Sequence, residues 1–76
     1  MGSDQYQQFR ELLVQARKNA RLTQTELSAR LERPQSFVSK YERGERRLDV
    51  VEFCDVAKAL GVDPARFLGR FLEEGM

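Results

Sequence analysis

Residues 22–44 have the sequence LTQTELSARLERPQSFVSKYERG, which is the pattern of two short helices joined by a tight turn. Thr23 and Glu26 have the spacing of a capping box, in which each side chain bonds a backbone N–H at the start of a helix. A helix is therefore predicted to begin at Gln24. The sequence indicates a helix-turn-helix that spans about residues 23–43.

The first of the two helices ends before the proline. Leu27 and Leu31 are four residues apart, so they share one narrow buried face. The residue before Pro34 is pushed out of the α region, so this helix ends by Glu32 or Arg33. Pro34 then suits the first turn of the next helix, where its missing N–H costs nothing.

The second helix has an apolar face and a polar face. Val38 and Tyr41 are three residues apart and are predicted to face inward, and Gly44 ends the helix. The outward side chains are polar or basic: Gln35, Ser36, Ser39, Lys40 and Arg43.

These motifs resemble a known family over about residues 9–68. TQTELSARL followed by PQSFVSKYERGER is similar to the Cro/C1-type (XRE-type) helix-turn-helix repressors. The resemblance implies an all-α, five-helix, lambda-repressor-like DNA-binding domain. Many members have glycine where this chain has Glu32, so the turn is expected to bend differently here or to hold Glu32 in a strained conformation at about 1 kcal/mol.

The resemblance also implies which residues would contact DNA. A helix in the major groove presents its N-terminal residues to base edges. The positions that match the base-contacting places of the family are Gln35, Ser36 and Lys40. Phe37 has two interpretations, contact with a thymine methyl group or packing beneath Pro34, and packing is favoured. Phosphate contacts set affinity and register without reading sequence. The residues expected to make them are Gln24, Arg33, Ser39, Arg43, Arg46 and Arg47.

One predicted contact is structural. Arg17 lies on the same side of the first helix as apolar Leu13, an unusual place for a charge. In the family, an arginine at this place pairs with the glutamate at the end of the recognition helix, which is Glu42 here. The resemblance therefore implies a bidentate ion pair that fixes the recognition helix against the first helix.

The rest of the chain forms three more predicted helices. The first covers about residues 4–19, the fourth about 50–60 and the fifth about 64–73. Asp49 and Glu52 repeat the capping-box spacing and Gly61 supplies a C-terminal stop. Helix five carries a wide apolar strip, and such a strip usually marks an interface. The resemblance implies a two-fold homodimer through Phe67, Leu68, Phe71 and Leu72. The alternative is that all four side chains complete the core of the monomer.

The length predicts one small domain, residues 1–76. The distribution of charge predicts that one side of this domain faces a polyanion. The net charge is only +1, but residues 21–47 hold seven basic and four acidic side chains, and residues 48–76 hold three basic and six acidic ones. This polarity orients the basic side toward nucleic acid. The expected partner is double-stranded DNA with a palindromic operator.

The composition excludes other classes. The chain has no histidine and one cysteine, Cys54, so neither a catalytic site nor a metal site nor a cofactor is predicted. No apolar run is long enough for a membrane span and the N-terminus is polar, so a cytoplasmic protein is expected.

The main hypothesis is a sequence-specific transcriptional regulator, a repressor in the simplest case. Two alternatives stay open. The same fold serves antitoxins and the controllers of restriction-modification operons, and a neighbouring toxin or methyltransferase gene would identify either. The chain could also be a protein-interaction adaptor that does not bind DNA, and a mobility-shift assay separates that function from the main one.

Overall fold

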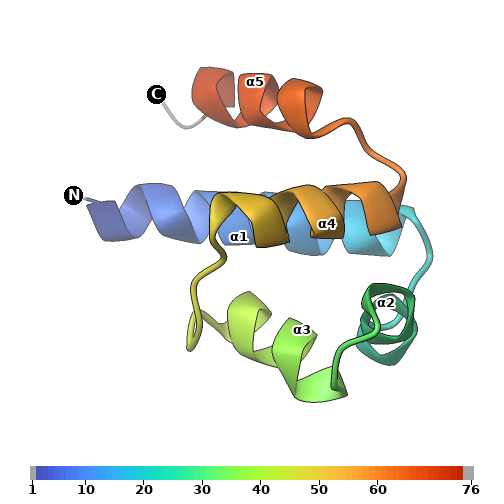
Figure 1. Cartoon of the computed structure of the whole chain (residues 1–76). Helices are drawn as coiled ribbons and strands as arrows, with labels where there is room; N and C mark the ends of the chain where they lie inside the picture. The colour runs from blue at the N-terminus through green and yellow to red at the C-terminus, as the bar shows by residue number, and fades with distance from the viewer. Residues whose placement is uncertain (1, 75–76) are drawn as a thin grey trace.

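The computed structural model describes residues 2–74, with side chains from residue 5 onward, and it contains five helices and no strand in that range. They are α1 (Gly2–Asn19), α2 (Gln24–Leu31), α3 (Gln35–Arg43), α4 (Val50–Leu60) and α5 (Pro64–Glu74). In Figure 1, α5 lies on one side of α1 and α4, and the α2–α3 pair lies on the other. The predicted all-α fold with a helix-turn-helix is confirmed.

Short-range signals set the helix boundaries. The Thr23 hydroxyl accepts a hydrogen bond from the backbone N–H of Glu26, and the Thr23 N–H donates to the Glu26 carboxylate, at 3.0 and 2.8 Å. Asp49 and Glu52 form the same reciprocal box before α4. One detail differs from expectation, because Pro34 stands just outside α3 as its N-cap residue, without a side-chain cap, and the helix begins at Gln35.

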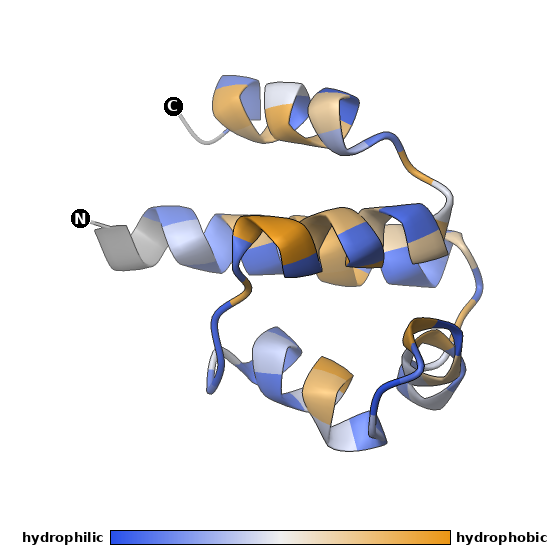
Figure 2. Cartoon of the chain, viewed as in Figure 1, coloured by the Kyte–Doolittle hydropathy of each residue, from blue (hydrophilic) through white to orange (hydrophobic). Residues whose placement is uncertain are grey.

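The core lies between α1, α4 and the helix-turn-helix. Val38 and Tyr41, the residues of α3 that were predicted to face inward, are buried there, and so is Phe37. Figure 2 shows hydrophobic residues concentrated along α4, whereas the turns before and after α3 are strongly hydrophilic. The buried cluster consists of Leu13, Leu27, Phe37, Val38, Tyr41, Phe53, Val56, Ala57 and Leu60.

An arginine from α1 closes the C-terminal end of α3. Gly44 ends this helix with φ of +80°, a left-handed conformation that favours glycine. The Nη1 group of Arg10 donates to the carbonyl of Glu42 at 2.8 Å, and a Cβ atom at Gly44 would lie 3.0 Å from the Arg10 Cζ atom. The helix end and the arginine side chain therefore occupy adjoining space.

Gly44→Ala is expected to lower the free energy of unfolding by about 1 to 2 kcal/mol, from backbone strain and from displacement of Arg10. Gly61→Ala is the matched control, because Gly61 has φ of +77° but no atom within 4 Å of an added Cβ. Urea denaturation of both variants checks the prediction. Equal losses would show that Arg10 moves aside without cost.

Candidate nucleic-acid interface

The outward side of α3 is polar, basic and open to solvent. Gln35, Ser36, Lys40 and Arg43 are exposed and Ser39 is half-buried. Phe37, Val38 and Tyr41 fill the opposite side, which is inside the core. The predicted base-contacting residues therefore share one accessible face at the start of this helix.

The turn before α3 keeps the conformation that glycine would favour. Glu32 adopts φ of +56° and ψ of +42°, the left-handed region, and its N–H donates to the carbonyl of Ala29 at 3.1 Å. The Arg33 N–H donates to Ser28 at 3.0 Å. Glu32 therefore carries backbone strain in this turn, at roughly 1 kcal/mol.

Glu42 joins three helices at the back of α3. Its carboxylate accepts hydrogen bonds from Nε and Nη2 of Arg17 in α1, at 2.7 and 3.1 Å. The amide of Gln24, the first residue of α2, donates to the same carboxylate at 2.9 Å. The side chains of Arg17 and Glu42 are only 12% and 5% exposed, and the hydrogen bond to Glu42 raises the pKa of Arg17.

Tyr41 also contributes to this side of α3. It is fully buried, and burial raises the pKa of its phenol well above the usual range. Its hydroxyl has no hydrogen-bond partner among the residues that the structure describes. The ring packs edge-on against Phe37, with centroids 5.7 Å apart. Tyr41 therefore holds α3 mainly by apolar packing.

Several of the predicted phosphate-contacting side chains already have partners in the protein. The Gln24 amide binds Glu42, and the Ser39 hydroxyl donates to the carbonyl of Ser36 at 3.3 Å. Arg43 pairs with exposed Glu45 at 3.1 Å. The Arg47 guanidinium lies over the ring of Tyr6, 4.5 Å from its centroid.

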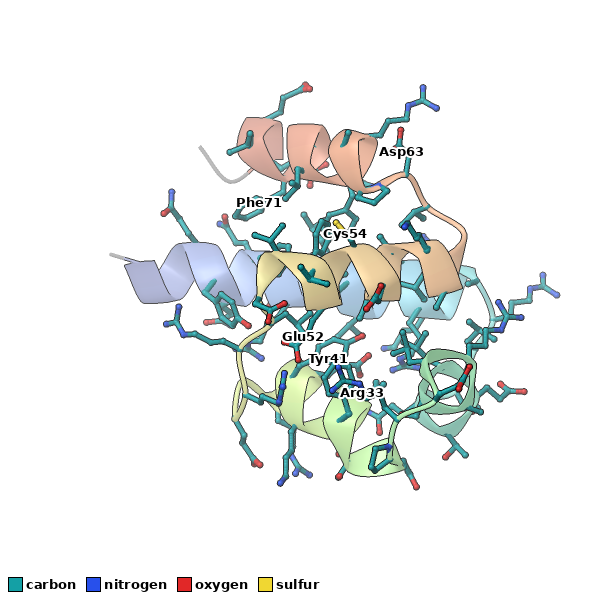
Figure 3. All side chains as sticks on the ribbon, viewed as in Figure 1. Arg33, Tyr41, Glu52, Cys54, Asp63 and Phe71 are labelled. Atoms are coloured by element: carbon teal, nitrogen blue, oxygen red, sulfur yellow. The ribbon has the colours of Figure 1, made fainter. Side chains whose placement is uncertain are left out.

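Arg33 and Arg46, two more of the predicted phosphate-contacting residues, both lie over the ring of Phe37. Their Cζ atoms lie 4.5 and 4.8 Å from the centroid of the Phe37 ring. Glu52 of α4 binds Arg46 through both carboxylate oxygens, at 2.6 and 3.0 Å, and lies 3.6 Å from Arg33. Figure 3 shows Arg33, Tyr41 and Glu52 in the region between α4 and α3. Phe37 therefore packs inside the protein, which is the interpretation that the sequence favoured.

The surroundings of Glu52 lower the pKa of its carboxyl group. Hydrogen bonds from Arg46 and from the backbone N–H of Asp49 lower the pKa of Glu52 from 4.5 to about 2. Sequence reasoning identified Glu52 only as a capping residue. Its capping role places the carboxylate beside the α3–α4 loop, but nothing in the sequence pairs it with an arginine.

The stability that depends on ionised Glu52 is expected to be lost at low pH. A lowered pKa means that this stabilisation is complete above about pH 4.5 and disappears as the pH falls toward 2. The difference in unfolding free energy between the wild type and Glu52→Gln should therefore shrink over this interval. Urea titrations at pH 7, 4.5, 3 and 2 measure it. A difference that stays constant down to pH 2 would contradict the ion pair.

The apolar strip on α5 is divided between the core and the surface. Phe67 packs on Phe9 and Phe53, with ring centroids 5.9 and 5.4 Å away, and Phe71 packs on Phe9 at 5.5 Å. Only Leu68 and Leu72 remain exposed. Two of the four residues predicted for the interface are thus turned toward the protein.

Two valines at the start of α4 add to the exposed apolar surface. Val50, Val51, Leu68 and Leu72 are 75%, 69%, 38% and 55% exposed. Figure 1 shows α4 and α5 running in opposite directions, and the two helices contact each other through the rings of Phe53 and Phe67. We call the four exposed residues the α4–α5 patch. The sequence did not identify the valines, which follow the Asp49 cap and have the spacing of an ordinary helix start.

Within residues 2–74, no group of histidine, cysteine, aspartate or glutamate side chains has the arrangement of a metal site. None of the helices there is both long and apolar enough to cross a membrane.

The comparisons with known proteins agree with this geometry. A family model described as a helix-turn-helix domain matches residues 8–67. The solved structure of an XRE-family like protein from Pseudomonas syringae pv. tomato str. DC3000 is similar, with a TM-score of 0.93 and 49% sequence identity, over 96% of this chain and 89% of that chain. No protein with a curated functional description matches. The chain belongs to the XRE-type helix-turn-helix domains, a family of DNA-binding regulators.

Proposed function

We propose that this protein is a sequence-specific DNA-binding transcriptional regulator that acts as a homodimer and represses by occupying its operator. The exposed polar face of α3 is the observation that carries the proposal. Its apolar side is locked into the core, and its C-terminal end is fixed by Glu42 and Arg10. A rigid helix with free polar side chains suits insertion into a major groove.

The residues at the start of α3 would read the base edges. Gln35 can bond adenine at N6 and N7, and Lys40 favours the O6 and N7 acceptors of guanine. Ser36 bonds several bases and adds little discrimination. All three side chains are exposed, so none has to leave an internal partner before it reaches DNA.

The phosphate contacts would come from both sides of α3. The first backbone N–H groups of α2 have no partner within the helix, and a helix start attracts anions. Because the Gln24 amide binds Glu42, this residue would meet phosphate through its backbone. Arg43, Arg33 and Arg46 keep exposed surface on or beside α3. Ser39 and Arg47 would complete the set.

The experiment that tests the function is selection of bound sites from a random DNA pool, followed by mobility shifts at several salt concentrations. We expect a palindromic site whose half-sites are about one helical turn, ~34 Å, apart. Log affinity should fall with log salt concentration by ~0.9 for each phosphate contacted. A pool without an enriched sequence would favour a protein-interaction adaptor. With DNA as its partner, the protein is expected to be cytoplasmic.

The α4–α5 patch would form the two-fold contact between subunits. Leu72→Glu is expected to give monomers in sedimentation experiments with little loss of stability, because Leu72 is exposed and contributes little to the core. Phe71 is a poorer test, since its ring packs on Phe9. Thr25→Glu, which adds the same charge at an exposed position of α2, is the control. A dimer that persists in Leu72→Glu would place the interface elsewhere.

A further inference from the structure

Four side chains form a closed set of contacts on the α4 side of the recognition helix. Arg33 comes from the turn before α3, Arg46 from the loop after it, and both guanidinium groups lie over the ring of Phe37. Glu52 contacts both arginines from α4. We call these four residues the Phe37 cluster. It connects the two ends of α3 through one carboxylate.

Glu52 holds the arginines without enclosing them. The Glu52 side chain is 13% exposed, whereas those of Arg33 and Arg46 are 41% and 37% exposed. Nη1 of Arg46 also donates to the carbonyl of Arg47 at 3.1 Å, so its position is fixed from two directions. Two guanidinium groups and one carboxylate leave a net charge of +1. Three N–H groups of Arg46 bond Glu52 and the Arg47 carbonyl, so its Nε–H and one Nη2–H are the donors that it keeps for an anion.

Holding an arginine in place changes what it costs to bind an anion. A free arginine side chain loses rotamer entropy when it closes on a phosphate, and a side chain already fixed by stacking and an ion pair loses less. A carboxylate nearby also repels the phosphate. The two effects have opposite signs.

We propose that Glu52 is a positioning residue for DNA binding, which orients the guanidinium groups of Arg33 and Arg46 toward the phosphates that flank the major groove. The proposal rests on the proposed function and goes beyond it, because it gives an acidic residue of α4 a favourable part in binding a polyanion. The Phe37 ring acts as the platform on which both arginines lie.

The test compares Glu52→Gln with Asp55→Asn, which removes the same charge from the same hollow beside Arg33 but from a carboxylate that bonds neither Arg33 nor Arg46. Affinity is measured for the selected operator and for a scrambled duplex over a salt series. For Glu52→Gln we expect operator affinity to fall about tenfold or more and the salt slope to become shallower by ~1 to 2 per half-site, since each lost phosphate contact removes ~0.9. Asp55→Asn should keep the wild-type slope.

A double-mutant cycle separates positioning from general stability. Arg33→Ala should weaken operator binding in the wild type and have little further effect in Glu52→Gln, because the arginine is no longer oriented. Arg46→Lys keeps the charge but cannot bond both oxygens of Glu52, so it should reproduce the loss of affinity. Arg46→Lys replaces Glu52→Gln as the test variant if Glu52→Gln does not fold.

Two results would overturn the proposal. Operator affinity that is unchanged or higher in Glu52→Gln would show that Glu52 only repels DNA. Lower affinity with an unchanged salt slope and fully additive Arg33→Ala would show that Glu52 only stabilises the fold. Failure of the wild type to select any DNA sequence would remove the proposed function as well, so the two failures are distinguishable.

Discussion

Glu42→Ala is expected to lower the free energy of unfolding by about 3 kcal/mol or more, a large part of the stability of a domain of this size. The variant leaves the guanidinium of Arg17 nearly buried without its carboxylate, and it also removes the acceptor of the Gln24 amide. Urea denaturation followed by circular dichroism measures the loss. Operator affinity should fall with it, because α3 is then held less firmly against α1.

The ion pair on α5 provides a matched control. Arg70 and Glu74 also lie 2.7 Å apart, but their side chains are 64% and 52% exposed. Glu74→Ala should therefore cost less than about 0.5 kcal/mol. The double variant Arg17→Met with Glu42→Leu should be less damaging than Glu42→Ala alone, because no unpaired charge stays in the interior. A double variant that costs as much as the two single changes together would refute this account.

The double variant Gln35→Ala with Lys40→Ala should abolish sequence preference and leave the fold and the dimer intact. Each bidentate base contact discriminates by ~1 to 3 kcal/mol, so each single change is expected to lower operator affinity about 10- to 100-fold. Both side chains are exposed and lie outside the core, so stability should change by less than about 0.5 kcal/mol.

Mobility shifts with the selected operator and a scrambled duplex measure the preference, and sedimentation measures the dimer. Gln8→Ala and Lys18→Ala are the controls, because they remove the same side-chain types from exposed positions on α1. If both single variants at α3 keep full operator selectivity, the assignment of the base-contacting residues is wrong.

The α5 strip shows where sequence pattern stops being informative. Four large apolar residues at Phe67, Leu68, Phe71 and Leu72 are wider than one buried stripe, so some exposure could be predicted. Which pair would be exposed depended on where Phe9 and Phe53 lie, and those residues come from α1 and α4. The pattern therefore predicted a wide apolar strip, but it did not show that Phe67 and Phe71 pack on the protein while Leu68 and Leu72 stay exposed.

The arginines show the same limit. Their positions around α3 predicted contacts with phosphate, and the sequence offered no partner for any of them within the protein. In the structure, the guanidinium of Arg46 bonds both carboxylate oxygens of Glu52, and the guanidinium of Arg47 lies over the ring of Tyr6. An arginine can bond any carboxylate or aromatic ring within reach, so its partner follows from the arrangement of helices and not from its neighbours in sequence.

The sequence by itself determined the five helices and the polar face of α3. Capping boxes, glycine stops and apolar spacing act through contacts within about four residues, so they operate before the chain is folded. Only the tertiary structure decided three contacts around α3. Arg10 bonds the carbonyl at the end of this helix, Gln24 bonds the Glu42 carboxylate, and Glu52 contacts two arginines. The Arg10 and Gln24 bonds to Glu42 join residues 32 and 18 positions apart, and such contacts form only when packing of the core brings the helices together.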